Sequence, residues 1–277
     1  MTASRAVLIT GCSSGIGHAT ALRLARGGWT VYATARKPET LADLAAAGCR
    51  TLALDVTDET SLRAAVAELD GPLGALVNNA GYSLSGAVEG VDLDEARRQL
   101  ETNVLGLVRL TQLVLPGMRA AGAGRIVNVG SMGGRLTFPG GGWYHASKHA
   151  LEALTDALRF EVAGFGIDVV LVQPGLIRTG FADTAVGGIA GRAADGPYAA
   201  FDAAVASVTA GAYAGGIAQR LGGDGDDVAR AIERALTARR PRTRYRVTGS
   251  ARLFLTLRRL LPDRAWDALV ARTYPRP

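Results

Sequence analysis

Cysteine is scarce in this chain, and the two cysteines present, Cys12 and Cys49, do not form a Cys-x-x-Cys pair. Two such residues cannot build a disulfide framework, so the sequence predicts a reducing compartment, and we expect a cytoplasmic location. The three histidines have no clustered cysteines or carboxylates beside them in the sequence. No metal site is therefore predicted.

Long apolar runs are missing as well. No uninterrupted run approaches the roughly 18 residues that a membrane span needs, and Met1 to Arg5 lack the charged and then apolar layout of a signal peptide. Lysine is nearly absent, since Lys37 and Lys148 are the only two among 31 basic residues. A lysine kept where arginine is the rule indicates a need for a compact ammonium group.

The chain does have enough apolar material for a large core. Of its 277 residues, 48% are hydrophobic and 20% are charged, which is typical of a globular protein. The net charge of +6 is uneven, because 11 arginines and two aspartates give residues 239–277 a charge of +9 and leave −3 on the rest. The basic character therefore belongs to the C-terminal segment.

Short apolar stretches alternate with segments of helical length. Continuous apolar strands between helices favour a parallel sheet buried on both faces, and right-handed crossovers make such a sheet doubly wound. We therefore predict an α/β Rossmann fold with three layers, α/β/α. The expected strands cover 6–10, 30–34, 51–54, 75–77, 125–129, 168–172 and 243–247.

The remaining segments are expected to be helical or irregular. A long helix is predicted over 93–121, with Pro116 kinking or breaking it. After Pro174 the alternation stops, and 180–225 is predicted to be a mobile helical insertion that forms a substrate lid. Residues 239–277 form a basic C-terminal extension, and no linker is evident, so we expect 1–277 to be one domain. Further helices are expected over 16–27, 41–47, 58–69, 143–164, 226–239, 253–261 and 265–273.

A glycine-rich turn follows the first expected strand and opens the first helix. It carries Gly11, Ser13, Ser14, Gly15, Ile16 and Gly17. Glycines let the backbone approach a pyrophosphate, and a helix N-terminus offers unpaired N–H groups. The position of this turn therefore predicts a nucleotide site, although its G-x-x-x-G-x-G spacing differs from G-x-G-x-x-G.

Tyr144 and Lys148 are four residues apart on an expected helix, so their side chains share a face. A nearby ammonium favours phenolate and lowers the pKa of a tyrosine, which makes the phenol a usable general acid or base. The alternative is an ordinary exposed tyrosine with a surface lysine. The two histidines near this pair, His145 and His149, are expected to point elsewhere, as surface or interface residues.

From Ala6 to Thr179 the chain resembles the short-chain dehydrogenase/reductase family in its single-domain form. The resemblance assigns the adenine contact to Asp55 and Val56 and a segment under the cofactor to Asn78, Asn79, Ala80 and Gly81. It implies a catalytic set of Asn103, Ser131, Tyr144 and Lys148, and a segment that closes over the nicotinamide in Pro174, Gly175 and Thr179.

The resemblance also implies a mechanism. Ser131 donates a hydrogen bond to the substrate oxygen, and Tyr144 gives that oxygen a proton as hydride arrives from the nicotinamide. Lys148 binds the ribose hydroxyls, and Asn103 holds a water that links Lys148 to solvent. The expected activity is therefore that of an oxidoreductase, a ketoreductase or dehydrogenase acting on CH–OH and C=O groups.

The expected cofactor is NADP(H). Family members that use NAD place an acidic residue at the end of the second strand, where it binds the ribose 2′-hydroxyl. Here Ala35 holds that place, and Arg36 and Lys37 follow. A guanidinium can bind a 2′-phosphate with two hydrogen bonds, so Arg36 is the predicted phosphate ligand.

The substrate is expected to be a lipophilic ketone, aldehyde or alcohol. Met132, Leu136, Phe138, Trp143 and Leu176 would line an apolar pocket, with Phe181 and Tyr198 on the lid. The residue sequences of the glycine-rich turn and of 32–36 are similar to those of the 17β-hydroxysteroid and retinol dehydrogenase-like branch. The physiological substrate, the favoured direction and the stereochemistry stay open.

Other functions and partners follow less directly. A non-catalytic nucleotide sensor or scaffold on the same fold is the alternative, and the complete set from Asn103 to Lys148 argues against it.

The family pairs helices into a homodimer or homotetramer, here through 93–121 and 143–164. The basic extension has three interpretations: a solvated capping unit, weak peripheral contact with anionic lipid, or nucleic-acid binding, which we do not expect because no known module occurs.

Overall fold

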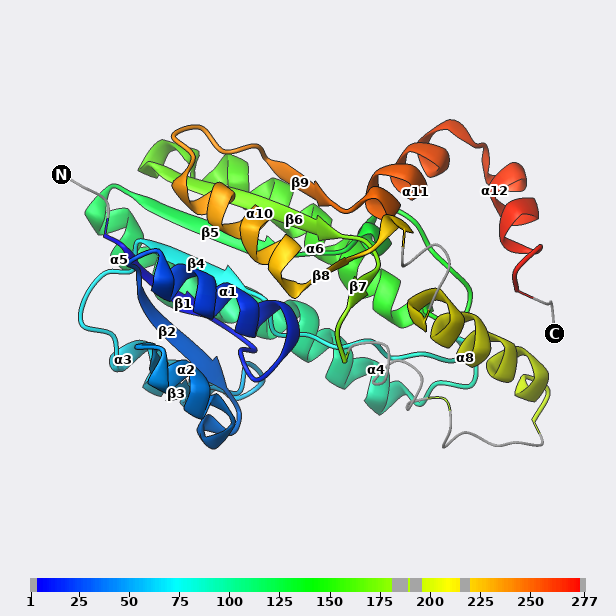
Figure 1. Cartoon of the computed structure of the whole chain (residues 1–277), viewed down its shortest axis with the longest axis horizontal. Coiled ribbons are helices and arrows are strands. Elements are labelled where there is room, and N and C mark those ends of the chain that lie inside the picture. Colours follow the sequence, from blue (N-terminus) through cyan, green and yellow to red (C-terminus); the bar gives the residue numbers. More distant parts are fainter. Residues whose placement is uncertain (1–3, 181–188, 190–195, 215–219, 275–277) are drawn as a thin grey trace.

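The computed structural model describes residues 4–180, 189, 196–214 and 220–274. Its centre is a seven-stranded sheet in which every pairing is parallel, with the order β3-β2-β1-β4-β5-β6-β9 (Figure 1). The predicted doubly wound fold and all seven predicted strands are confirmed. The strands are β1 (Ala6–Ile9), β2 (Thr30–Ala35), β3 (Arg50–Ala53), β4 (Ala75–Asn78), β5 (Gly124–Val129), β6 (Ile167–Pro174) and β9 (Arg244–Val247).

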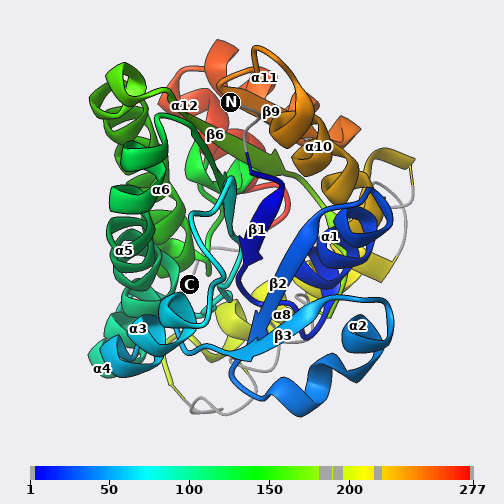
Figure 2. The ribbon, with the colours of Figure 1, turned by 90° about the vertical axis from the view of Figure 1, so that its left-hand side faces the viewer.

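Helices cover both faces of the sheet, as a view along it shows (Figure 2). One face carries α1 (Gly15–Arg26), α2 (Ala42–Ala46) and α10 (Gly225–Thr237). The opposite face carries α3 (Glu59–Ala67), α4 (Leu93–Leu100), α5 (Gly106–Ala121) and α6 (Gly142–Glu161). Short 3₁₀ turns occupy Pro38–Leu41 (η1), Met132–Gly134 (η3) and Ala163–Phe165 (η4).

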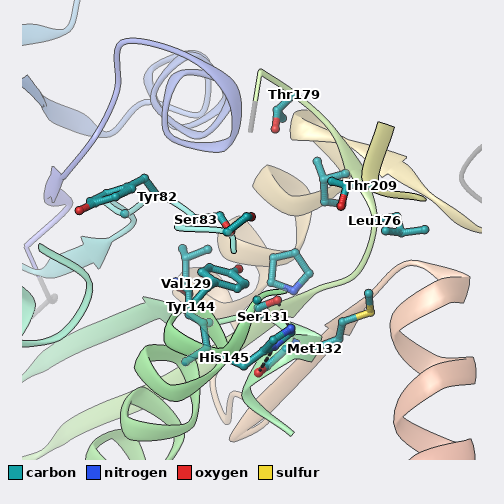
Figure 3. A pocket seen from close by; sticks show the side chains of 18 of the residues that line it. Tyr82, Ser83, Val129, Ser131, Met132, Tyr144, His145, Leu176, Thr179 and Thr209 are labelled. Carbon is teal, nitrogen blue, oxygen red and sulfur yellow. Dashed lines mark hydrogen bonds between the residues drawn. The ribbon is translucent and has the colours of Figure 1, made fainter. Parts of the chain in front are cut away.

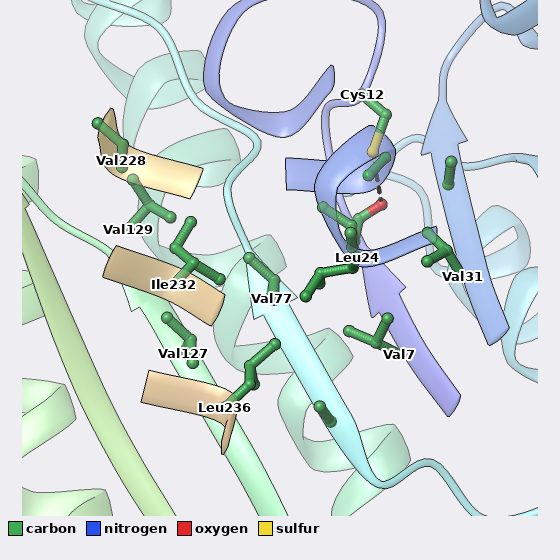
Figure 4. Packing of buried hydrophobic residues seen from close by; sticks show 14 of the residues in the cluster. Val7, Cys12, Leu24, Val31, Val77, Val127, Val129, Val228, Ile232 and Leu236 are labelled. Carbon is green, nitrogen blue, oxygen red and sulfur yellow. Dashed lines mark hydrogen bonds between the residues drawn. The ribbon is translucent and has the colours of Figure 1, made fainter. Parts of the chain in front are cut away.

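The alternation of side chains along a strand explains why β1 is apolar on both of its faces. In β1, Val7 lies in the cluster under α1 and α10 (Figure 4), and Ile9 belongs to the same cluster. Leu8 belongs to the cluster on the opposite face. Successive strand residues point to opposite faces, and here both faces are covered. The first cluster also receives Leu24 from α1 and Ile232 from α10.

The long helix does not break at Pro116, which was one of the two outcomes predicted there. The helix is interrupted earlier, by the π-helical turn η2 (Glu101–Leu105) between α4 and α5, and α5 runs past Pro116 to Ala121. A proline removes one backbone hydrogen bond inside a helix. Val114 and Met118 on either side of it are buried in the core, and this packing carries the helix across the proline.

The segments after Pro174 depart most from the predicted pattern. Two short strands, β7 (Ile177–Arg178) and β8 (Gly223–Asp224), form a second parallel pair that was not predicted. The expected insertion over 180–225 contains α8 (Ala199–Ala214), while Phe181 lies outside the described residues. The predicted basic helices are α11 (Gly249–Leu260) and α12 (Asp263–Val270), which lie with α8 beyond the carboxyl end of the sheet (Figure 1).

Glycine at the start of α5 permits close contact with the loop after β3. A Cβ added to Gly106 would lie 2.1 Å from the carbonyl oxygen of Val56, whereas one added to Gly117 in the same helix would meet only the Pro72 Cβ, at 4.0 Å. We predict that Gly106→Ala lowers the free energy of unfolding by about 1–3 kcal/mol, the usual cost of overpacking.

Gly117→Ala is the matched control. It should leave stability unchanged or raise it by about 0.5–1 kcal/mol, because alanine favours a helix over glycine. Urea denaturation of both variants measures the difference. Equal stabilities for the two would contradict the close approach of α5 to Val56.

Candidate active site

A cavity of about 1760 Å³ opens at the carboxyl ends of the sheet strands. In α/β sheets, ligands bind in the crevice outside these ends. Its walls run continuously from the glycine-rich turn, past the end of β5 and the start of α6, to α8, α11 and α12. The predicted residues that line it are Gly11, Ser13, Ser14, Gly15, Ile16, Arg36, Asp55, Val56, Asn79, Ala80, Gly81, Ser131, Tyr144, Lys148, Pro174, Gly175 and Thr179.

The glycine-rich turn is shaped by backbone conformations that need glycine. Gly11 and Gly15 have φ angles of +72° and +59°, in the left-handed region that side chains rarely adopt. A Cβ on Gly17 would lie 2.2 Å from the Gly11 carbonyl oxygen, so the turn needs a glycine here to pack against itself. Gly17 itself does not line the cavity. The first turn of α1 contains no acidic residue, which leaves its positive end available to a phosphate.

Hydrogen bonds join the end of β4 to this turn. The Asn79 amide nitrogen donates to the carbonyl oxygens of Thr10 at 2.9 Å and Gly11 at 3.0 Å. In return, the Thr10 hydroxyl accepts from the backbone N–H groups of Asn79 and Ala80, both at 2.9 Å. These four bonds fix the floor of the cavity to two adjacent strands.

The residues predicted to select the cofactor lie at the neighbouring strand ends. Ala35 and Arg36 line the cavity after β2, and the Arg36 side chain is exposed, whereas Lys37 is not among the lining residues. After β3, the Asp55 carboxylate accepts from the backbone N–H and the hydroxyl of Thr57 at 2.9 and 2.8 Å. These bonds hold the short loop that carries Asp55 along the cavity wall.

Ser131 and Tyr144 lie near each other in the cavity (Figure 3), and Lys148 lines it as well. Ser131 follows β5, and its hydroxyl accepts from the Gly133 N–H at 3.0 Å, which caps the turn η3. The Lys148 ammonium lies 5.9 Å from the centre of the Tyr144 ring and donates to the Val129 carbonyl at 3.0 Å. Burial lowers the pKa of Lys148 to about 8, since desolvation disfavours its charged form.

Asn103 lies behind this group rather than on the cavity surface. It belongs to the π-helical turn η2 and is 1% exposed. Its amide nitrogen donates to the Tyr82 carbonyl at 2.9 Å and the Ser147 hydroxyl at 3.0 Å, and its amide oxygen accepts from the Tyr82 N–H at 3.1 Å. A Cβ on Gly81 would contact both Asn103 Oδ1, at 3.0 Å, and Lys148 Nζ, at 3.9 Å.

The end of β6 closes the side of the cavity. A Cβ on Gly175 would lie 2.4 Å from the hydroxyls of Ser250 and Thr248, so the start of α11 sits directly against this glycine. Thr179 reaches the opposite wall, because a Cβ on Gly15 would meet its Cγ2 at 3.3 Å. The segment after Pro174 therefore bridges the glycine-rich turn and the C-terminal helices.

Residues 5–189 match the family described as short chain dehydrogenase. The chain belongs to this family. It is 35% identical to the uncharacterized oxidoreductase YbbO of Escherichia coli over 96% of this chain and 94% of that protein. It is also 35% identical to human retinol dehydrogenase 5, over 98% and 89% of the two chains. The predicted class, an NAD(P)-dependent oxidoreductase of this family, is confirmed.

Solved structures of family members agree with the fold. A short-chain dehydrogenase from Streptomyces avermitilis superposes with a TM-score of 0.79 at 35% identity, covering 98% of this chain and 95% of that one. A serine dehydrogenase in complex with NADP⁺ has a TM-score of 0.75 at 27% identity, over 88% and 94% of the chains. A 3-ketoacyl-(acyl-carrier-protein) reductase from Brucella melitensis in complex with NADH has 0.73 at 27%, over 89% and 97%.

The predicted apolar wall of this dehydrogenase is correct in part. Met132, Leu136, Phe138 and Leu176 line the cavity. Trp143 is instead packed in a separate cluster with Leu84, Val91, Ala96 and Tyr82. Tyr198 also turns away from the cavity: it packs on Phe201 and donates its hydroxyl hydrogen to Glu89 at 2.7 Å.

Sequence reasoning missed the contribution of the C-terminal helices to this wall. Their apolar side chains, spaced three or four residues apart as on one helix face, could have indicated it. The arginines between them favoured a solvated unit instead. The wall receives Val205, Val208 and Thr209 from α8, and Phe254, Leu257, Trp266, Leu269, Val270, Thr273 and Tyr274 from α11, α12 and the turn that follows.

The prediction that His145 points away from the site is wrong. It is 8% exposed and lines the cavity beside Tyr144, with their ring centres 5.6 Å apart (Figure 3). Burial lowers the pKa of His145 to about 4, so the imidazole is neutral at neutral pH. His149, one turn further along α6, is exposed as expected.

Cys12, in the glycine-rich turn, is a packed core residue. Its thiol is fully buried and donates to the Ile9 carbonyl at 3.3 Å. Burial raises the pKa of the Cys12 thiol to about 12, which keeps it protonated and unreactive. Among the helices that the structure describes, none combines the length and the apolar character that crossing a bilayer requires.

Proposed function

We propose that this dehydrogenase transfers hydride between NADP(H) and the carbonyl or alcohol group of a lipophilic small molecule, with Tyr144 as the general acid or base. The observation that carries the proposal is the meeting of Ser131, Tyr144 and Lys148 in a cavity that also contains the glycine-rich turn. One ligand could thus bind the turn with its phosphates and place its reactive end beside the phenol. Gly11 and Gly15, both with left-handed backbone conformations, line the cavity at this turn, and such a backbone turn at a helix N-terminus fits a phosphate.

Each residue has a role that its position permits. The bound nicotinamide supplies or accepts the hydride. In the reductive direction, the Ser131 hydroxyl donates a hydrogen bond to the substrate oxygen, and Tyr144 transfers its phenolic proton to that oxygen. The ammonium of Lys148 stabilises the phenolate left behind. Because burial lowers the pKa of Lys148 to about 8, this group also returns a proton readily.

The choice of NADP(H) rests on charge at the end of β2. Arg36 lines the cavity on the same side as Ser13 and Ser14, and Ala35 leaves this strand end without a carboxylate. A carboxylate there would repel a 2′-phosphate, whereas a guanidinium binds it. Structures of family members contain NADP⁺ in one case and NADH in another, so this local charge is the basis for the choice.

A lipophilic substrate is supported by the walls beyond Tyr144. Phe138, Leu176, Phe254 and Trp266 present apolar surface to the part of the cavity that a cofactor would not fill. Burying such surface against an apolar ligand is favourable by about 25 cal/mol per Å². The similarity to a retinol dehydrogenase agrees with this substrate class. The cytoplasmic location and the weak lipid contact of the C-terminal extension stay predictions.

Turnover should depend on the Tyr144 hydroxyl. We expect Tyr144→Phe to lower kcat by at least about 10²-fold, the usual contribution of a general acid, with little change in cofactor affinity. Lys148→Arg should also lower kcat, because a planar guanidinium cannot replace a compact ammonium in this buried position. Absorbance of the nicotinamide with a panel of ketones and aldehydes measures turnover, and fluorescence titration measures cofactor binding.

Tyr198→Phe is the matched control, since its hydroxyl bonds Glu89 and its ring lies outside the cavity. It should keep wild-type kcat. Near wild-type turnover by Tyr144→Phe would refute the proposed chemistry.

Cofactor preference should depend on Arg36. The wild type should favour NADPH in kcat/KM, and Arg36→Ala should lose roughly 10-fold or more of that preference while changing little with NADH. A charge-assisted hydrogen bond contributes about 1.5–3 kcal/mol, which sets this scale. Lys37→Ala removes the adjacent cation, which does not line the cavity, and should keep the preference. Equal use of both cofactors by the wild type would show the assignment of Arg36 to be wrong.

We also propose that α5 and α6 pair with those of a second copy. The two helices lie side by side on the outer surface (Figure 2), and Leu105, Leu154 and Phe160 are exposed there, by 54%, 40% and 88%. Light scattering should give two or four times the chain mass of 28.7 kDa. Leu154→Asp should lower that mass, and Leu260→Asp, at an exposed leucine of α11, should not. A monomer mass for the wild type would contradict the pairing.

A further inference from the structure

His145 directly follows Tyr144 in α6, and its ring contacts two backbone groups outside that helix. Its Nδ1 lies 2.9 Å from the Gly133 carbonyl oxygen, and its Nε2 lies 3.2 Å from the Phe138 backbone nitrogen. Gly133 belongs to the turn that Ser131 caps, and Phe138 belongs to the apolar wall. One side chain thus touches the segment 131–138 at both of its ends.

The two contacts fix the tautomer of the ring. The Phe138 N–H can only donate, so Nε2 must accept and carries no proton. Nδ1 therefore bears the hydrogen and donates it to the Gly133 carbonyl. A protonated ring would place a second N–H against the Phe138 N–H and lose this bond. The low pKa of His145, about 4, agrees with a ring that stays in this neutral form.

Glycines leave the room that this arrangement needs. A Cβ on Gly133 would lie 2.7 Å from His145 Nδ1, and one on Gly141 would lie 3.0 Å from Nε2. Real Cβ atoms essentially never come as close as the first distance and rarely as close as the second, so both positions favour glycine. The ring is held tightly between them, which is what a side chain that positions its neighbours requires.

The residue at the far end, Phe138, is the centre of an aromatic group. Its ring lies 5.8 Å from Phe254 and 5.9 Å from Trp266 in the C-terminal helices, and 6.4 Å from Tyr274. All four rings line the cavity. The position of the Phe138 backbone therefore influences the wall that α11 and α12 present to the substrate.

We propose that His145 is a positioning residue with two separable functions: Nδ1 holds the turn that carries Ser131, and Nε2 holds Phe138 in the substrate wall. The proposal rests on the proposed function, because it assigns Ser131 to the reacting oxygen and the aromatic wall to the apolar part of the substrate. It adds His145, which belongs to the same helix as Tyr144, as the side chain that links the turn of Ser131 to the aromatic wall.

Two substitutions separate the functions. The amide nitrogen of asparagine is as many bonds from Cβ as Nδ1, so His145→Asn keeps a donor for Gly133 and loses the acceptor for Phe138. The amide oxygen of glutamine is as many bonds from Cβ as Nε2, so His145→Gln keeps the acceptor and loses the donor. His145→Ala removes both, and His149→Ala, at an exposed residue of the same helix, is the control.

Kinetics with NADPH and two aldehydes, butanal and dodecanal, test the assignment. His145→Asn should raise KM for dodecanal about 2- to 10-fold, the value of one neutral hydrogen bond, with kcat and the butanal KM nearly unchanged. His145→Gln should lower kcat for both aldehydes by a similar factor with little change in KM. His149→Ala should match the wild type. If the His145→Asn and His145→Gln variants show the same changes in kcat and KM, or no change in either, the proposal is wrong.

Hydrogen exchange provides a readout that needs no turnover. On a peptide covering residues 135–141, His145→Asn and His145→Ala should expose the Phe138 amide to about 2- to 10-fold faster exchange, while His145→Gln should keep its protection. Unchanged exchange in all three variants would overturn the proposal by itself. If the wild type reduces neither aldehyde but exchange follows this pattern, the hydrogen-bond assignment stands and the failure falls on the proposed function.

Discussion

The buried ammonium of Lys148 ties the helix of Tyr144 to the end of β5. Its hydrogen bond to the Val129 carbonyl, at 3.0 Å, spans the junction between α6 and the sheet two residues before Ser131. A buried cation without partners is costly, so this bond and the nearby phenol ring constrain where α6 can lie. The position of Tyr144 relative to Ser131 follows from that anchoring, whereas the lowered pKa of the lysine comes from its burial.

A chain of buried amides and hydroxyls reinforces the same junction. The Asn78 amide nitrogen donates to Thr111 in α5 at 3.1 Å and to Asn128 in β5 at 2.9 Å, and Asn128 donates to Thr155 in α6 at 2.9 Å. Low dielectric strengthens such bonds and makes an unmade one costly. The network therefore fixes α5 and α6 against β4 and β5, and with α5 the π-helical turn that carries Asn103.

How far the sequence predicted this molecule depends on whether a feature is local. Most of the seven strands were predictable because they contain apolar runs buried in the sheet, whereas β3 and β9 are partly exposed. The spacing of Tyr144 and Lys148 indicated a shared helix face. The uninterrupted course of α5 past Pro116 was not predictable, since packing around Val114 and Met118 outweighs the proline signal. His145 was misjudged because helix periodicity gives a direction but not what loop lies there, and that loop comes from residues 131–141.

The C-terminal extension shows why composition alone was a poor guide to the substrate wall. Its arginines gave it a charge of +9, which suggested contact with solvent or anions. In the fold, Phe254 and Leu257 face the cavity, while Arg252 and Arg259 are exposed on the same helix. A two-faced helix divides its residues between two environments, so its net charge describes only the outer one. The apolar inner face, held by Phe138, is the part that the substrate would meet.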